Sequence, residues 1–144
     1  MAKVTLENLN KIFVSKIGKD VKAVNDFNLL LEDGEILALL GSSGCGKTTT
    51  LRMIDGFETA TSGQIKIGER IVNDLKPADR NVAMAFEGYA LYPPLTVKDN
   101  IAFSLMREKI SKDKVDSKVM EVAELLEITD ILERYPPSIS GGQQ

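Results

Sequence analysis

The sequence predicts an α/β fold organised around a phosphate-binding loop. Residues 41–48 read Gly-Ser-Ser-Gly-Cys-Gly-Lys-Thr, which is a complete G-x-x-x-x-G-K-[ST] pattern. An unbroken apolar run at 36–40 precedes the loop, and a helix-compatible run at 48–54 follows it. A strand, a loop and a helix in this order are the context in which the pattern forms a phosphate site.

Composition narrows the class of protein. With 144 residues, the chain is long enough to bury a core as one domain. A β-rich part with the phosphate loop is expected at 1–92 and a helical part at 93–144. The net charge of −3 gives no basic footprint for nucleic acid. Histidine is absent, which excludes His-based metal sites and triads, and the single cysteine excludes an internal disulfide.

The β-rich part is expected to begin with an edge strand that starts at Val4–Leu6 and continues towards Phe13–Val14. After a turn at Ser15–Asp20, a second strand is expected from Val21 to Leu31. The run Ile36–Leu40 has no polar alternation, which is typical of a central parallel strand buried on both faces. After the loop, the buried side of a helix is expected to contain Leu51, Met53 and Ile54. A hairpin about Gly68 and a second buried strand at Val82–Phe86 complete this part.

Two helices are expected after Pro93. Thr96 and Asp99 have the spacing of a capping box that opens a helix from Val97 to Met106. Ser111 has the position of a cap for a second helix. The apolar residues of that helix are expected on one face and are Val115, Val119, Val122 and Leu126.

Each residue type in the phosphate loop has a physical reason. Glycines allow successive backbone N–H groups to curve around an anion, and the following helix adds its positive end. Lys47 supplies a charge to the β- and γ-phosphates, and Thr48 offers a hydroxyl to Mg²⁺. Cys45 is either a small residue tolerated between glycines or a thiol with a lowered pKa.

Two further segments each allow two interpretations. Residues 86–97 contain two tyrosines and a Pro-Pro pair, which fit either a packed aromatic turn or a loop that contacts a partner. The final Ser140-Gly141-Gly142-Gln143 fits either a polar tail or a helix start that presents a hydroxyl and N–H groups to an anion.

In their order and spacing, these segments resemble the nucleotide-binding subunit of an ATP-binding cassette (ABC) transporter, in particular the maltose and glycerol-phosphate importer group. The resemblance covers nearly the whole chain and includes the loop, the stretch from Tyr89 to Phe103 and the signature Ser140–Gln143. It implies a P-loop NTPase fold of the ABC ATPase type, with an antiparallel β subdomain and part of a helical subdomain.

The resemblance also implies roles for individual residues. Phe13 would stack on adenine, with a core aromatic as the alternative, and the signature would close over ATP held by a second nucleotide-binding subunit. Tyr89–Val97 would lie near the contact with transmembrane permease subunits. The implied function is ATP-driven import of a solute, a sugar, from the cytoplasmic face of the membrane. ATP and Mg²⁺ would be held by Gly41, Ser42, Ser43, Gly44, Cys45, Gly46, Lys47, Thr48, Thr49, Ser140, Gly141, Gly142 and Gln143.

Two departures from the family pattern qualify the expected chemistry. The family has a glutamine that contacts Mg²⁺ and the attacking water where this chain has Glu87, so catalytic roles fall to Lys47 and Glu87 and metal contacts to Thr48 and Glu87. The chain also ends inside the signature, before the Walker B strand, its catalytic glutamate and the switch histidine. These 144 residues are therefore expected to bind nucleotide at most. A soluble ABC-type ATPase that acts on nucleic acid or the ribosome is the alternative function.

The same truncation predicts an incomplete core sheet. A central strand at Ile36–Leu40 expects a parallel neighbour on each side, and in the family one neighbour comes from the part beyond Gln144. Unpaired edges and exposed apolar faces promote association. Self-association of the chain is therefore expected.

Overall fold

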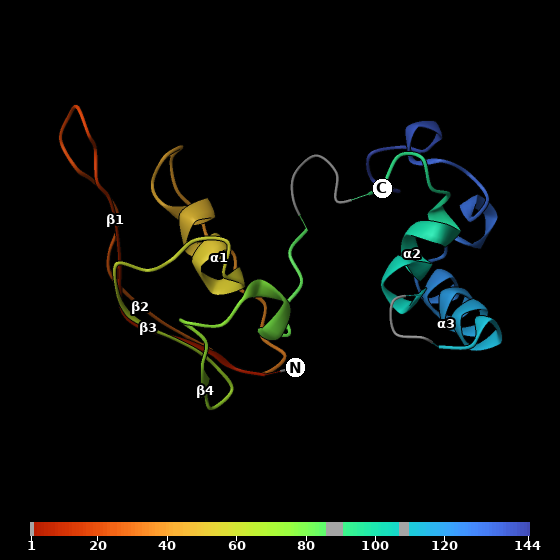
Figure 1. Ribbon diagram of the computed structural model, residues 1–144, viewed down its shortest axis with the longest axis horizontal. Coiled ribbons are helices and arrows are strands. Elements are labelled where there is room, and N and C mark those ends of the chain that lie inside the picture. The colour runs from red at the N-terminus through yellow and green to blue at the C-terminus, as the bar shows by residue number, and fades with distance from the viewer. Residues whose placement is uncertain (1, 86–90, 107–109) are drawn as a thin grey trace. The chain divides into compact units, whose positions relative to one another are not determined.

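The computed structural model describes residues 2–85, 91–106 and 110–144, and Figure 1 shows its elements. The chain divides into two compact units, Met1–Met84 and Ala85–Gln144, each described separately below. In the described residues, no helix combines the length and apolarity that crossing a bilayer requires.

The N-terminal unit contains a four-stranded antiparallel sheet in the order β2-β1-β3-β4. The two long predicted strands and the predicted hairpin all form, but the predicted edge position of the first strand is wrong, because β1 pairs with β2 on one side and β3 on the other. Their bounds are β1 Val4–Phe13, β2 Val21–Leu31, β3 Ser62–Ile67 and β4 Arg70–Ile71. Alternating apolar positions and the Gly68 turn were sufficient to predict these elements, because both signals are local.

Irregular register in β1 decides which of its side chains are buried. The pairing with β2 shifts between Leu6 and Leu9 and again between Leu9 and Lys11, and Asn8 has a positive φ of 48°. Such bulges interrupt the alternation by which successive side chains of a strand point to opposite faces of the sheet. As a result Leu6, Leu9 and Lys11 are all buried, although a regular strand would place Leu6 and Leu9 on opposite faces.

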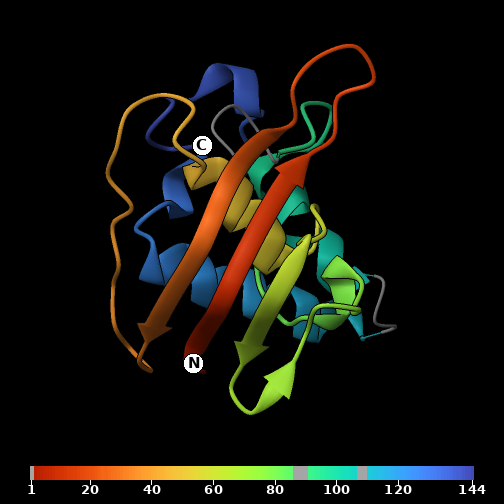
Figure 2. The same ribbon diagram turned by 90° about the vertical axis from the view of Figure 1, so that its left-hand side faces the viewer.

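Helix α1, Lys47–Asp55, follows the phosphate loop and lies across one face of the sheet (Figure 2). Met53 is fully buried against the sheet and its neighbours, in a cluster with Leu6, Leu9, Val24, Ile65 and Val72. The predicted burial of Leu51 is wrong, because this side chain is 44% exposed. Leu51 lies two residues from Met53, about 200° around the helix, and therefore faces away from the sheet.

The two predicted parallel strands do not form in the described residues. Residues 36–40 and 82–85 have no strand pairing, so these predictions are wrong for the described residues, and Phe86 of the second strand lies outside them. A strand needs neighbours to satisfy its N–H and C=O groups, and the four described strands pair only with one another. The apolar run is consequently open to solvent, with Ile36 95% and Leu40 91% exposed.

Arg80 connects the far end of α1 to the segment after β4. Its guanidinium donates to the carbonyl oxygens of Met53 at 2.7 Å and Ile54 at 2.9 Å, in the last turn of the helix. It also donates to Leu75 O at 3.0 Å and Asn73 O at 3.1 Å. The residue is 5% exposed, and a cation at a helix C-terminus is favourable.

The C-terminal unit packs two helices, α2 Val97–Met106 and α3 Lys112–Leu125. The Asp99 N–H donates to Thr96 Oγ1 at 3.1 Å, which confirms Thr96 as the cap of α2. Ser111 is at the N-cap position of α3, but its side chain makes no capping hydrogen bond. Two short 3₁₀ turns follow, Thr129–Ile131 and Pro136–Ser138.

The buried face of α3 differs from the prediction in its second half. Val115 and Val119 are buried as expected, and Ala123 continues their spacing at 0% exposure. The predicted burial of Val122 and Leu126 is wrong, since they are 38% and 59% exposed. The buried positions Val115, Val119 and Ala123 are four residues apart and form one row along the helix, and Leu126 lies just beyond the end of α3.

Candidate functional site

The phosphate loop is held against β2 by direct backbone contact. Gly46 is the N-cap of α1 and has a φ of 95°, and Gly44 has a φ of 81°. A Cβ atom built on Gly46 would lie 2.3 Å from the carbonyl oxygen of Ala23 in β2. Only glycine combines the two requirements of this position: it adopts a left-handed backbone without strain, and it has no Cβ to clash with β2.

Lys47 folds back over the loop that precedes it. Its Nζ donates to Gly41 O and Ser42 O, each at 2.8 Å, and lies 3.5 Å from Cys45 Sγ. Thr50 fixes the start of the helix, because its N–H and its hydroxyl both donate to Gly46 O, at 2.8 and 3.0 Å. The structure thus brings the predicted lysine and the loop backbone together.

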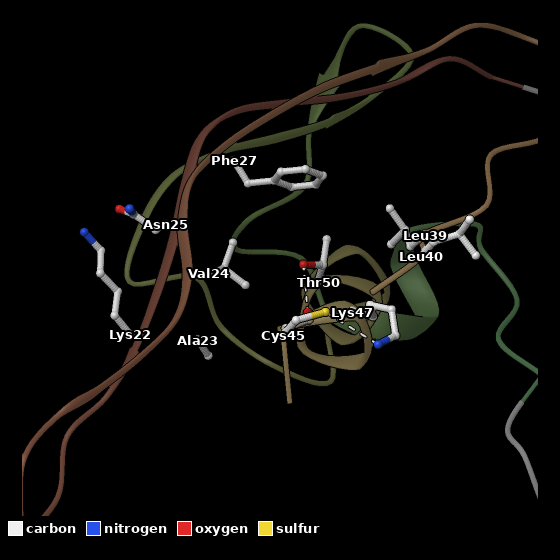
Figure 3. Close-up of a pocket in the computed structure, with 11 residues that line it drawn as sticks. Lys22, Ala23, Val24, Asn25, Phe27, Leu39, Leu40, Cys45, Lys47 and Thr50 are labelled. Carbon is white, nitrogen blue, oxygen red and sulfur yellow. Dashed lines mark hydrogen bonds between the residues drawn. The ribbon is translucent and has the colours of Figure 1, made fainter. Parts of the chain in front are cut away.

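A cavity of about 340 Å³ lies between β2 and this loop (Figure 3). Its size falls within the range of small-molecule sites. One wall is formed by the backbone and side chains of β2, and the other by the loop, the start of α1 and the apolar run before the loop. The lining residues are Lys22, Ala23, Val24, Asn25, Phe27, Leu39, Leu40, Cys45, Gly46, Lys47 and Thr50.

The electrostatics of the loop favour an anion. The first turn of α1 contains no acidic residue, so the positive end of the helix is not neutralised from within the helix. Ser42, Ser43 and Thr48 are exposed and accessible to a ligand. Within the described part of the chain, no group of three or more acidic or cysteine residues could hold a metal by itself. A lone Thr48 hydroxyl fits Mg²⁺ that takes its other ligands from phosphates and water.

Phe13 lies close to this cavity in the sheet without lining it. It pairs with Val21 at the end of β1, and the next residue of β2, Lys22, lines the cavity. Phe13 is 41% exposed, and the Lys11 Nζ atom lies 4.9 Å from the centroid of the Phe13 ring. Sequence reasoning did not single out Lys11, since a lysine in a strand is usually a surface residue.

The other predicted site residues do not line this cavity in the described structure. Glu87 and Tyr89 lie outside the described residues, and Ser140–Gln143 belong to the C-terminal unit. There the Gln143 N–H donates to Ser140 Oγ at 3.3 Å, and the Ser140 N–H donates to Gln143 Oε1 at 3.0 Å. These are the reciprocal bonds of a capping box, which favour the interpretation of this segment as a helix start.

The described part of the tyrosine-rich segment is ordered by Asn100. Its side-chain amide accepts from the Tyr92 N–H at 2.7 Å and donates to three carbonyl oxygens, those of Tyr92, Leu95 and Thr96. The Tyr92 ring packs against Phe103 with a centroid distance of 4.5 Å, yet Tyr92 remains 49% exposed. A packed turn and a partner-contacting surface are therefore compatible.

The G-x-x-x-x-G-K-T loop followed by helix α1 has the form of the phosphate-binding loop of P-loop proteins, and comparison with known families specifies which kind. Residues 24–144 match the ABC transporter family, and the chain belongs to that family. The predicted family is therefore confirmed.

Characterised relatives show the same similarity over the whole chain. The sn-glycerol-3-phosphate import ATP-binding protein UgpC of Ruegeria pomeroyi is 47% identical over 144 residues. The trehalose/maltose import ATP-binding protein MalK of Thermococcus litoralis is 49% identical over 150 aligned residues. The chain is covered completely in both comparisons, and it spans about 40% of the length of these relatives.

Comparison with solved structures confirms the predicted ABC ATPase type of fold. A dimeric ATP-binding cassette in a post-hydrolysis state, bound to ADP and Pi, superposes with a TM-score of 0.82 at 26% identity. The match covers 97% of this chain and 64% of that cassette.

Proposed function

We propose that this chain binds ATP with Mg²⁺ at Gly41–Thr49. The observation that carries the proposal is the cluster of Lys47 Nζ, the glycine backbone and the unneutralised N-terminus of α1 beside one cavity. Loop N–H groups and the lysine would hold the β- and γ-phosphates, and Thr48 would ligate Mg²⁺. The relative bound to ADP and Pi supports a nucleotide as the ligand.

We further propose that the chain is part of the ATP-binding subunit of a solute importer. The names of the UgpC and MalK relatives support this function and favour a sugar or a related polar solute. Such a subunit would work on the cytoplasmic face of the membrane. Its partners would be a second ATP-binding subunit, to which Ser140–Gln143 would present a helix start, and membrane permeases contacted near Tyr89–Val97.

Glu87 would be the second ligand of Mg²⁺ in this function. A carboxylate binds Mg²⁺ well but adds negative charge close to the γ-phosphate, so we expect MgATP binding with altered turnover. In a longer protein that contains the remaining cassette, Glu87→Gln should change the steady-state rate of phosphate release. Identical kinetics for the two proteins would refute this role.

Calorimetric titration of the 144-residue chain with MgATP tests the binding proposal. Lys47→Met should weaken binding at least about tenfold, because it removes a charge-assisted contact to phosphate. Lys19→Met is the matched control, since Lys19 is an exposed lysine in the turn between β1 and β2. Absence of MgATP binding by the native chain, or equal affinities for the two variants, would refute the proposal.

A further inference from the structure

The ammonium group of Lys11 connects two segments of the N-terminal unit, β1 and the loop that contains Glu58 and Thr59. Its Nζ donates to Glu58 Oε1 at 2.7 Å and to Thr59 O at 2.8 Å, and it lies 4.9 Å from the ring centroid of Phe13. The Lys11 side chain is only 10% exposed. Since a buried ammonium needs partners, these contacts fix where the charge lies.

The ion pair with Glu58 is well defined on both sides. Glu58 Oε1 also accepts a hydrogen bond from the Thr59 N–H at 3.1 Å, so the carboxylate is anchored to its own loop. The pKa of Glu58 is lowered, chiefly by the hydrogen bond from Lys11. The carboxylate is therefore charged at neutral pH and keeps the ammonium in place.

The position of this ammonium restricts the Phe13 ring. A cation over an aromatic face is attracted by the ring quadrupole, and the attraction is stronger when the cation is desolvated. Phe13 remains 41% exposed, so part of the ring is available to a ligand. Because Phe13 pairs with Val21 and the adjacent Lys22 lines the cavity, a ligand in the cavity could reach the ring.

We propose that Lys11 is a positioning residue for nucleobase binding: it holds the Phe13 ring in an orientation that stacks on the base of a nucleotide whose phosphates lie in the Gly41–Thr49 loop. This inference rests on the proposed nucleotide binding. Lys11 would not touch the nucleotide, and its effect would reach the ligand through the aromatic ring.

A purely structural role for Lys11 makes a different prediction. If Lys11 only anchors the loop at Glu58 and Thr59 to the sheet, its loss should weaken every ligand of the phosphate loop equally. A positioning role should weaken only ligands that carry a base. Inorganic tripolyphosphate has the phosphates of ATP without the base, so the ratio of the two affinities separates the roles.

The experiment is calorimetric titration of the 144-residue chain with MgATP and with magnesium tripolyphosphate. Lys11→Met should weaken MgATP about fivefold and leave the tripolyphosphate affinity within about twofold. Lys11→Arg, which keeps the cation, should retain most of the native ratio. Lys66→Met is the matched control, because Lys66 forms an ion pair of 2.7 Å with Glu7 in the same sheet, and it should alter neither affinity.

A second pair of variants tests whether Lys11 affects MgATP affinity through the Phe13 ring. Phe13→Leu should lower MgATP affinity about tenfold with little effect on tripolyphosphate, since base stacking contributes through the ring. In that background, Lys11→Met should cause no further loss. An equal fall in both affinities, no change in either, or a full effect without Phe13 would each overturn the proposal. If the native chain bound neither ligand, the proposed function itself would fail.

Discussion

Gly46 and Ala23 approach so closely that a Cβ atom on Gly46 would lie 2.3 Å from the Ala23 carbonyl oxygen. The phosphate loop and β2 therefore meet through bare backbone. A larger residue at the N-cap of α1 would have to move the loop away from the strand, and with it the N–H groups that we propose to hold phosphate.

Gly46→Ala tests this contact. We expect a loss of about 3 kcal/mol in the free energy of unfolding, from left-handed strain and overpacking together, with loss of MgATP binding. Gly44→Ala is the control, because Gly44 has a similar φ of 81° but open space around its Cβ position. It should cost only about 1 kcal/mol. Urea denaturation followed by circular dichroism measures both, and equal losses would contradict the role of the Ala23 contact.

Arg80→Met should destabilise the N-terminal unit by about 3 kcal/mol. The change leaves four carbonyl oxygens without their donor, two in the last turn of α1 and two in the segment after β4. Arg80→Lys should rescue little, since an ammonium lacks the guanidinium fork. Arg70→Met should cost less than about 0.5 kcal/mol, because Arg70 is exposed and makes a long 3.4 Å bond to Asp79 O. The same denaturation assay compares them, and similar losses for Arg80→Met and Arg70→Met would be inconsistent with this account.

The Glu58 carboxylate should make stability depend on acidity. Its pKa is lowered in the folded chain from the ordinary value of 4.5, mainly by the hydrogen bond from Lys11. A lowered pKa means that the folded state binds fewer protons, so this stabilisation is present above about pH 4.5 and is lost as the pH falls through the folded value. The difference in unfolding free energy between the native chain and Glu58→Gln should therefore shrink between neutral pH and pH 3. A constant difference across that interval would disprove the linkage.

The exposed apolar run before the phosphate loop should drive self-association. Ile36 and Leu40 are more than nine-tenths exposed, and adjacent exposed apolar residues favour burial against another copy. Ile36→Lys should reduce the mass measured by light scattering towards that of a monomer. Ile17→Lys is the control, because Ile17 is 99% exposed in a turn and its chain neighbours are Lys16 and Gly18. A monodisperse native monomer would refute the prediction.

Sequence reasoning predicted the elements whose signals are local. The antiparallel strands, the Gly68 hairpin, the helix after the phosphate loop and the Thr96 cap were all predicted. Each depends on residues within a few positions of one another. Residues 36–40 and 82–85 do not form the predicted strands, because an apolar run becomes a strand only when neighbouring strands are present to pair with it.

Two buried charges could not be found from the sequence. Lys11 contacts Glu58, 47 residues away, and Arg80 contacts Met53, 27 residues away. Their spacing follows no local pattern, and basic residues in a single sequence are expected at the surface. Only the packing of the loops around α1 shows that both are partnered in the interior.

The sequence by itself determined the phosphate loop, since Gly41–Thr48 specifies its chemistry through glycine freedom, a helix start and one lysine, all within eight consecutive positions. The tertiary structure decided what surrounds that loop. It placed β2 against Gly46 and the Lys11 ammonium against Glu58, and it left Ile36 and Leu40 in solvent. These contacts join residues far apart in the chain, so they arise only when the segments fold against one another.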